Sequence, residues 1–244
     1  MQKNEWFRDW FNSPYYHILY KNRNLKEAKL FISNLTEHLS INYDSRVLDL
    51  GCGKGRHSVE LKKYYNSVKG IDLSSNSIKN AKNHEANGLT FAIEDMRNFK
   101  SISKFNAIFN LFTSFGYFND HNDNINTLKS CNRALFKNGL IVIDYLNANK
   151  IKMNINKNET KVIDGIEFHI ERKIENEKIL KKIVFEHDNI SYNFEEKVQL
   201  FTLTNFIDLF KKSDFILDKT FGNYHLQSYE SEISDRLILI AKKK

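Results

Sequence analysis

Three glycines alternate with other residues where an apolar run meets a helical pattern. Gly51, Gly53 and Gly55 fall within the stretch VLDLGCGKGRH of residues 47–57, in a chain that has nine glycines and one proline in total. Glycine is needed where φ must be positive or where the backbone must approach a ligand closely. A helix that begins directly after such a turn points its first N–H groups at that ligand. The spacing therefore predicts a turn that holds a cofactor against its backbone.

The spacing also narrows the choice of cofactor. A dinucleotide-binding turn has the pattern G-x-G-x-x-G, but here the third glycine comes one residue early and Arg56 stands in its place. The phosphate-loop pattern G-x-x-x-x-G-K-[ST] is absent as well. Asp72, at the end of the next apolar run, suits the paired hydroxyl groups of a ribose, and Asp95 follows the third run, where an adenine ring would lie. These residues favour a nucleoside cofactor other than a dinucleotide.

The elements that must position these residues alternate between strand and helix. Strands are expected at 46–50, 67–72, 89–93, 105–111, 140–146, 215–221 and 237–241, and helices at 54–65, 75–86, 122–136 and 204–212. Such alternation predicts a parallel sheet with helices on both faces. The fold class is therefore α/β, a doubly wound Rossmann-like sheet, and residues 1–244 are expected to form one domain.

Two segments depart from this rhythm. The N-terminal segment 1–40 is rich in aromatic residues and then amphipathic, which predicts helices packed beside the sheet. Segment 160–201 alternates apolar and polar residues, as in Ile166, Phe168 and Ile170 against Glu167 and His169. Period-two alternation across short turns predicts an inserted antiparallel β-meander.

Composition limits the classes of partner. The 37 basic residues give a net charge of +7, but they are 29 Lys and 8 Arg spread over the whole chain, so the charge alone does not indicate nucleic acid. No apolar run reaches the length of a membrane span, and charged residues near the N-terminus do not resemble a signal peptide, so a cytoplasmic protein is expected. Cys52 and Cys131 form no pattern of metal ligands, and no metal site is expected.

Taken together, the motifs D-L-G-C-G-K-G, G-I-D-L-S and E-D-M-R resemble those of the class I S-adenosylmethionine-dependent methyltransferases. The resemblance covers residues 46–146, and the closing strands continue it. It implies a seven-stranded sheet of order 3-2-1-4-5-7-6 with the last strand antiparallel, and S-adenosyl-L-methionine as the cofactor. It also implies direct, in-line transfer of the methyl group.

The resemblance further implies which residues hold the cofactor. Asp49 and the glycine loop would hold its methionine part, Asp72 would accept both ribose hydroxyls, and Asp95 would accept from the adenine amino group. The complete set implied for the cofactor is Asp49, Gly51, Cys52, Gly53, Gly55, Arg56, His57, Asp72, Leu73, Asp95, Met96 and Asn110.

Candidates for the methyl acceptor lie after the fourth strand and in the N-terminal segment. The residues expected to contact it are Tyr16, Tyr20, Arg23, Ser114, Tyr117 and Tyr224. The side chains considered for proton transfer are His17, Tyr117, Asp144 and His225. The N-terminal helices would fold over the cofactor as a lid, and the alternative is a helix packed with exposed tyrosine tips.

The leading hypothesis is methyl transfer to nitrogen or oxygen of a small molecule. Methylation of RNA, DNA or protein is an alternative, which is weakened because no N/D-P-P-Y/F follows the fourth strand and neither cysteine follows a proline. A non-catalytic module that only binds the cofactor is a second alternative. The β-meander would cover the acceptor site or pair two subunits in a homodimer.

Overall fold

The structure is a computed structural model, and it describes residues 5–21 and 25–244. The predicted acceptor residue Arg23 lies outside the described residues. The N-terminal helices are α1 (Trp6–Asn12), α2 (Pro14–Leu19) and α3 (Leu25–Leu39). The helices that follow are α4 (Arg56–Leu61), α5 (Ser75–Ala81), η1 (Lys82–His84), α6 (His121–Ala134), α7 (Ala148–Met153) and α8 (Leu203–Lys211).

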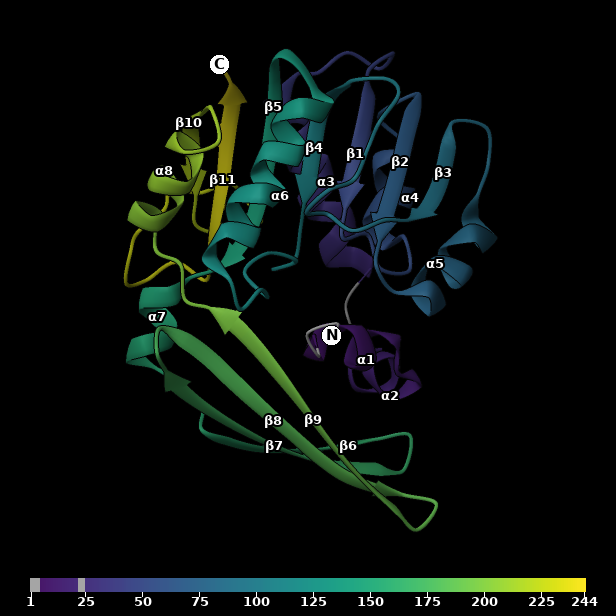
Figure 1. Cartoon of the computed structure of the whole chain (residues 1–244), viewed down its shortest axis with the longest axis vertical. Helices are drawn as coiled ribbons and strands as arrows, with labels where there is room; N and C mark the ends of the chain where they lie inside the picture. Colours follow the sequence, from purple (N-terminus) through teal and green to yellow (C-terminus); the bar gives the residue numbers. More distant parts are fainter. Residues whose placement is uncertain (1–4, 22–24) are drawn as a thin grey trace.

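A seven-stranded sheet forms the larger part of the molecule (Figure 1). Its strands are β1 (Arg46–Leu50), β2 (Ser67–Asp72), β3 (Leu89–Ile93), β4 (Phe105–Asn110), β5 (Leu135–Leu146), β10 (Phe215–Phe221) and β11 (Arg236–Lys243). Their order is β3-β2-β1-β4-β5-β11-β10, and β11 runs antiparallel to both of its neighbours. The predicted fold class and strand order are confirmed.

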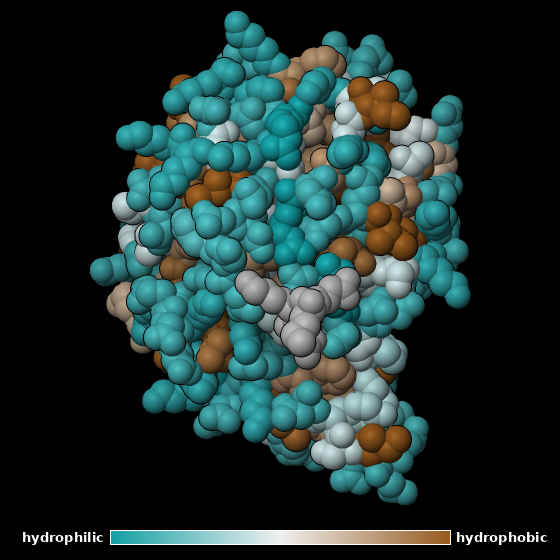
Figure 2. All heavy atoms as spheres, viewed as in Figure 1, coloured by the Kyte–Doolittle hydropathy of each residue, from teal (hydrophilic) through white to brown (hydrophobic). Residues whose placement is uncertain are grey.

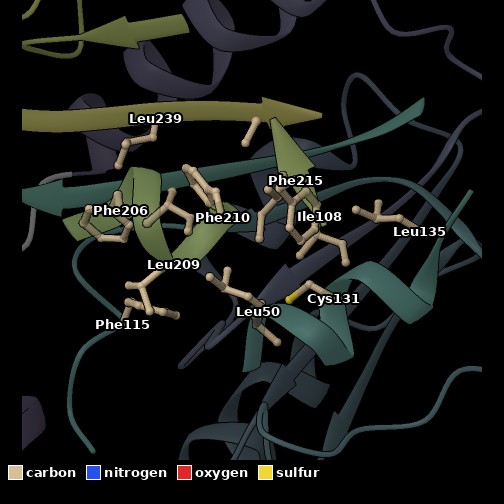
Figure 3. Packing of buried hydrophobic residues seen from close by; sticks show 14 of the residues in the cluster. Leu50, Ile108, Phe115, Cys131, Leu135, Phe206, Leu209, Phe210, Phe215 and Leu239 are labelled. Atoms are coloured by element: carbon tan, nitrogen blue, oxygen red, sulfur yellow. The ribbon is translucent and has the colours of Figure 1, made fainter. Parts of the chain in front are cut away.

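Helices cover both faces of this sheet because its strands are apolar on both sides. On one face Leu50 and Ile108 pack with Cys131 of α6 and Leu209 of α8, as Figure 3 shows. On the other face the side chains that alternate with these pack against α3, α4 and α5. Strands buried on both faces are typical of parallel sheets. The packing on both faces holds the strands in place, and the predicted site lies at their carboxyl ends.

A separate four-stranded antiparallel sheet follows α7. Its strands are β6 (Asn158–Ile163), β7 (Ile166–Glu175), β8 (Lys178–His187) and β9 (Ile190–Gln199), hydrogen-bonded in that order. The apolar side chains predicted from the alternation, Ile166, Phe168 and Ile170, are buried against α1 and α2 together with Trp10 and Leu19. Figure 1 shows α1 and α2 between the two sheets.

Three helices differ from the sequence expectation. The helix predicted at 54–65 begins later, at Arg56, because Gly55 is left-handed with φ 83°, and it ends earlier, at Leu61. The helix predicted at 75–86 is divided into α5 and the short 3₁₀ turn η1. The helix α7 was not predicted, and its six residues are too few for an apolar period to stand out.

The face of the molecule seen in Figure 2 is largely hydrophilic. Figure 2 shows one face on which hydrophobic residues are scattered rather than gathered in a patch. Within residues 5–21 and 25–244, no helix is both long enough and apolar enough to span a membrane. Cys52 and Cys131 are both buried and form no disulfide.

Candidate cofactor and acceptor site

The glycine loop follows β1 in a conformation that side chains rarely adopt. Gly51 has φ 76° and Gly53 has φ 55°. A Cβ atom on Gly51 would lie 2.8 Å from the Cβ of Ser114, closer than real Cβ atoms approach, whereas a Cβ on Gly53 would meet no atom within 4 Å. A side chain at position 51 would therefore clash with Ser114, whereas the backbone of Gly53 is open to an approaching ligand.

A buried carboxyl group stands behind this loop. Asp49 is 1% exposed, and its Oδ2 accepts a hydrogen bond of 2.6 Å from the hydroxyl of Ser58 on α4. Burial raises the pKa of Asp49 to about 7, although the Ser58 hydroxyl opposes this. The group can therefore change its charge near neutral pH when a ligand brings a positive charge beside it.

Asp72 joins the end of β2 to the glycine loop. Its Oδ2 accepts from the N–H of Gly53 at 2.9 Å, and its Oδ1 accepts from the N–H of Ser74 at 2.8 Å. Burial raises the pKa of Asp72, and these two backbone N–H groups oppose the shift. The carboxylate is fixed by the backbone on both sides, which leaves its orientation defined before any ligand arrives.

The acid after β3 is held by a neighbouring arginine. The guanidinium of Arg97 donates to both oxygens of Asp95, at 2.5 Å for the closest pair, and it also contacts Glu5 and Asp123. Burial acts to raise the pKa of Asp95, but the hydrogen bonds from Arg97 outweigh it and hold the pKa below its usual value. Asp95 is thus ionised, and much of its acceptor capacity is taken by Arg97.

The segment after β4 brings polar groups to the same sheet edge. Asn110 is buried, and its Nδ2 donates to the carbonyl of Leu50 at 2.8 Å, while its Oδ1 has no hydrogen-bond partner among the described residues. Ser114 donates to the carbonyl of Leu111 at 2.9 Å. Tyr117 donates its hydroxyl proton to the carbonyl of Thr113.

One cavity of about 560 Å³ unites most of the predicted residues. The cofactor candidates on its wall are Gly51, Cys52, Gly53, Arg56, His57, Asp72, Leu73, Asp95 and Met96, and the acceptor and base candidates on its wall are Tyr16, His17, Tyr20, Ser114 and Tyr117. Asp49, Gly55 and Asn110 are not part of the wall and support it from behind.

Aromatic rings form the side of the cavity that faces α1 and α2. The ring centroids of Phe11 and Tyr117 lie 5.3 Å apart, those of Phe11 and Tyr16 lie 4.9 Å apart, and those of Tyr16 and Tyr20 lie 5.0 Å apart. Trp6 donates its indole N–H to the carbonyl of Tyr117 at 3.3 Å. This chain of rings connects the N-terminal helices to the segment after β4.

Three of the acceptor and base candidates, Asp144, Tyr224 and His225, do not line the cavity. Asp144 is fully buried and accepts from Arg236 at 2.7 Å, from Tyr224 at 3.0 Å and from the N–H of Phe112 at 2.9 Å. Tyr224 stacks on Phe31 of α3, with ring centroids 4.3 Å apart. His225 is exposed in the loop after β10. Phe112, whose backbone N–H binds Asp144, does line the cavity.

Residues outside the sets of cofactor and acceptor candidates also line the wall. They include the aromatic residues Phe7, Phe112 and Phe118, together with Ser77 of α5 and His84 of η1. The aromatic richness of segments 6–20 and 112–118 was the available signal for the first three. No sequence signal indicates that η1 folds back to the site.

Known proteins resemble this chain in sequence and in fold. Residues 41–209 match a family model described as a methyltransferase domain, which covers more than half of the chain. The chain belongs to the methyltransferase family. The curated relatives include YqeM of Bacillus subtilis (strain 168), whose name assigns it provisionally to the methyltransferases, with 32% identity over 46% of this chain and 47% of the relative. Another is a dTDP-3-amino-3,4,6-trideoxy-alpha-D-glucopyranose N,N-dimethyltransferase of Streptomyces venezuelae, with 28% identity over 41% of this chain and 42% of the relative.

Solved structures resemble the methyltransferase chain over almost its full length, whereas the match to the two curated relatives spans less than half of their length. An S-adenosylmethionine-dependent methyltransferase from Clostridium acetobutylicum ATCC 824 has a TM-score of 0.79 and 19% identity, over 94% of this chain and 96% of that one. DesVI of Streptomyces venezuelae has a TM-score of 0.71 and 17% identity, over 94% and 97%. At these identities the likeness establishes the fold, and it confirms the predicted class I methyltransferase architecture.

The methyltransferase family implies S-adenosyl-L-methionine as the cofactor, and the residues on the wall fit it. The open side of Gly53 gives a ligand direct access to the backbone, and Asp72 presents a carboxylate beside it. The uncharged wall of aromatic rings suits a cationic sulfur, because ring faces attract positive charge by about 0.5–2 kcal/mol. Among the described residues no group of three His, Cys, Asp or Glu side chains is arranged to hold a metal ion.

Proposed function

We propose that this methyltransferase transfers the methyl group of S-adenosyl-L-methionine to a nitrogen or oxygen atom of a small-molecule acceptor. The observation that carries the proposal is that one cavity wall combines the glycine loop and Asp72 with the aromatic rings of α1, α2 and the segment after β4. A cofactor at the first set of residues and an acceptor at the second would share one enclosed space.

The chemistry asks little of the protein beyond positioning. The cofactor supplies a methyl group already activated by its positively charged sulfur. Gly53 and Asp72 orient the cofactor, and the ring of Phe112, which lies 5.0 Å from the guanidinium carbon of Arg56, helps to enclose the space. Holding two reactants in line can supply about 7–11 kcal/mol in well-oriented systems.

Two features support a small acceptor. The helices α1 and α2 pack between the two sheets and cover the cavity, which leaves little room for a nucleic acid or a folded protein. The relative from Streptomyces venezuelae is named for methylating the amino group of a nucleotide sugar, which supports nitrogen as the accepting atom.

The test is release of S-adenosylhomocysteine by the purified protein in the presence of amines, amino sugars and hydroxylated metabolites. The expected result is release with at least one acceptor, and loss of release in the variant Asp72→Asn. Tight binding of the cofactor with no release of S-adenosylhomocysteine for any acceptor would favour the non-catalytic binding module instead. Methylation confined to RNA or protein would refute the small-molecule proposal.

The lid and the homodimer remain part of the proposal. The support for a lid is that α1 is held over the cavity by an ion pair between Glu5, directly before α1, and Arg97, in the segment after β3. The helix α3 instead packs on the sheet through Phe31 and Leu35. The proposed cover is therefore chiefly α1 and α2. For the homodimer through the meander, the outward face pairs Glu171 with Lys182 across strands, so a dimer there would be polar. Light scattering of the purified protein tests that contact.

A further inference from the structure

The inner face of the meander carries a row of charged side chains beside its apolar cluster. Arg172 of β7 lies opposite Lys181 of β8, and Lys181 lies opposite Glu196 of β9. Arg172 also forms an ion pair of 2.5 Å with Glu159 of β6. These side chains lie on the same face as the apolar residues Phe168, Ile170 and Ile183, which pack against α1 and α2. The row therefore points toward the N-terminal helices rather than to solvent.

Two members of this row reach the cavity through a tyrosine. Tyr20 is one of the residues that line the cavity, and its hydroxyl donates to Oε1 of Glu196 at 2.7 Å. The ammonium group of Lys181 donates to the hydroxyl oxygen of the same tyrosine and lies 3.5 Å from Oε2 of Glu196. The indole N–H of Trp10 also donates to Oε1 of Glu196, at 2.7 Å. A continuous chain of hydrogen bonds thus leads from the cavity wall to a carboxylate of the meander.

Stability alone does not account for this chain. The side chains of Lys181 and Glu196 are 13% and 16% exposed. A buried ion pair is often no more stabilising than apolar residues of similar volume, and apolar residues occupy the neighbouring positions of the same face. A buried polar network beside a cavity is therefore a candidate for a chemical role.

The charged groups around Lys181 include both acids and bases. Burial lowers the pKa of Lys181, the charge of Glu196 opposes this, and Arg172 and Lys161 add to the lowering. Arg172 and Lys161 are both paired with Glu159. From α2, the groups that face this region on the cavity side are Tyr16 and His17.

We propose that Tyr20, Glu196 and Lys181 form a proton relay that deprotonates an amine acceptor. The inference rests on the proposed function and narrows its acceptor to a protonated amine. In the step, the acceptor N–H bond breaks and its proton joins the oxygen of Tyr20, while the hydroxyl proton of Tyr20 passes to Glu196. The electron pair of the broken bond remains on the nitrogen, which can then accept a methyl group, and Lys181 stabilises the negative charge on the tyrosine oxygen during the transfer.

The first test compares Glu196→Gln and Tyr20→Phe with the wild type over a range of pH, with an amine acceptor that the wild type methylates. Near neutral pH both variants should lose about a hundredfold in kcat, the scale of general acid–base catalysis. The loss should shrink at high pH, where the amine is already neutral. A merely structural role would give the same loss at every pH, and that result, or no loss at all, would overturn the relay.

The matched control is Tyr15→Phe. Tyr15 lies on α2, which ends directly before Tyr20, and its hydroxyl contacts Nδ1 of His187 on the meander at 3.1 Å, but it does not line the cavity. This variant removes one hydroxyl between α2 and the meander without touching the relay. It should keep the wild-type pH profile, and a profile like that of Tyr20→Phe would overturn the assignment.

A second test needs no acceptor, because the chain has two tryptophans. The indole N–H of Trp10 donates to Glu196, and that of Trp6 donates to the carbonyl of Tyr117. In a nuclear magnetic resonance spectrum the Trp10 indole signal should therefore report on Glu196, and the Trp6 indole signal serves as an internal reference. The Trp10 signal should move in Glu196→Gln and Tyr20→Phe and stay in place in Tyr15→Phe, while the Trp6 signal stays in place in all three.

The two tests separate the relay from the proposed function. If the wild type methylates no amine, the proposed function fails in that respect, and the Trp10 signal alone decides whether the hydrogen-bond chain exists. A Trp10 signal unchanged by both Glu196→Gln and Tyr20→Phe overturns the chain whatever the activity.

Discussion

Replacing Gly53 by alanine tests whether the glycine loop holds the cofactor. Gly53 has φ 55°, and a Cβ there would meet no protein atom within 4 Å. The methyl group would instead project into the space in front of the loop, where the cofactor is expected. Binding and folding should therefore respond differently to this one change.

The chain provides a matched control in Gly165→Ala. Gly165 lies in the turn between β6 and β7, has φ 78°, and would also meet no atom within 4 Å, but it does not line the cavity. A left-handed alanine costs about 1–2 kcal/mol in either position. Each variant should thus unfold at a temperature lower by about 2–8 °C, since about 1 kcal/mol corresponds to 2–4 °C in a chain of this size.

Only Gly53→Ala should weaken binding of S-adenosylhomocysteine in a calorimetric titration. The loss should be at least about tenfold, which corresponds to about 1.4 kcal/mol and is the scale of a lost backbone contact. Equal affinity in the two variants, with equal losses of stability, would show that the loop does not contact the cofactor and would refute the reasoning.

Three further changes test the groups around the loop. Asp72→Asn removes the charge and keeps an acceptor for only one of the two backbone N–H groups that Asp72 binds, so affinity for S-adenosylhomocysteine should fall by about 1.5–3 kcal/mol in the same calorimetric titration. The melting temperature should fall as well, because the amide NH2 faces the other N–H donor. The pKa of Asp49 is about 7 in the folded protein and about 3.9 in an unfolded chain, so between these pH values the unfolded state holds fewer protons. The free energy of unfolding, measured by urea denaturation, should therefore fall as pH rises from about 4 to about 7. Asp49→Asn should depend less on pH over this range, and a pH dependence equal to that of the wild type would contradict the role of burial. Arg97→Met removes the contacts with Glu5, Asp95 and Asp123 and should lower the free energy of unfolding by about 1.5–3 kcal/mol in the same denaturation assay. Amide hydrogen exchange should increase first in α1. Exchange that increases uniformly over the chain would argue against a tie between α1 and the sheet.

Much of the large sheet could be predicted from local sequence. The bounds of β1, β2, β3 and β10 agree with the predicted strands, because each is a short apolar run bounded by polar or turn residues. The glycine loop could also be placed, since the positive φ at Gly51 and Gly53 follows from glycine spacing after a buried strand. These features depend on residues that are neighbours in sequence.

The parts of the site that could not be predicted depend on contacts between distant residues. Asp144 was expected at the cavity because it lies late in a strand, but its pairing with Arg236, 92 residues away, turns its carboxylate to the backbone of Phe112. Tyr20 could be nominated from its position in an aromatic segment, whereas its partners Lys181 and Glu196 lie more than 160 residues further on. In the meander, alternation indicated which face is buried, but it could not show what that face covers.

The most direct test of the central claim is mass spectrometry of the acceptor after incubation with S-adenosyl-L-methionine that carries a deuterated methyl group. The wild type should place one intact deuterated methyl group on a nitrogen or oxygen of a small acceptor, and Asp72→Asn should place far less. An acceptor that stays unlabelled in every mixture, while the wild type binds S-adenosylhomocysteine in the cavity, would contradict methyl transfer at this site.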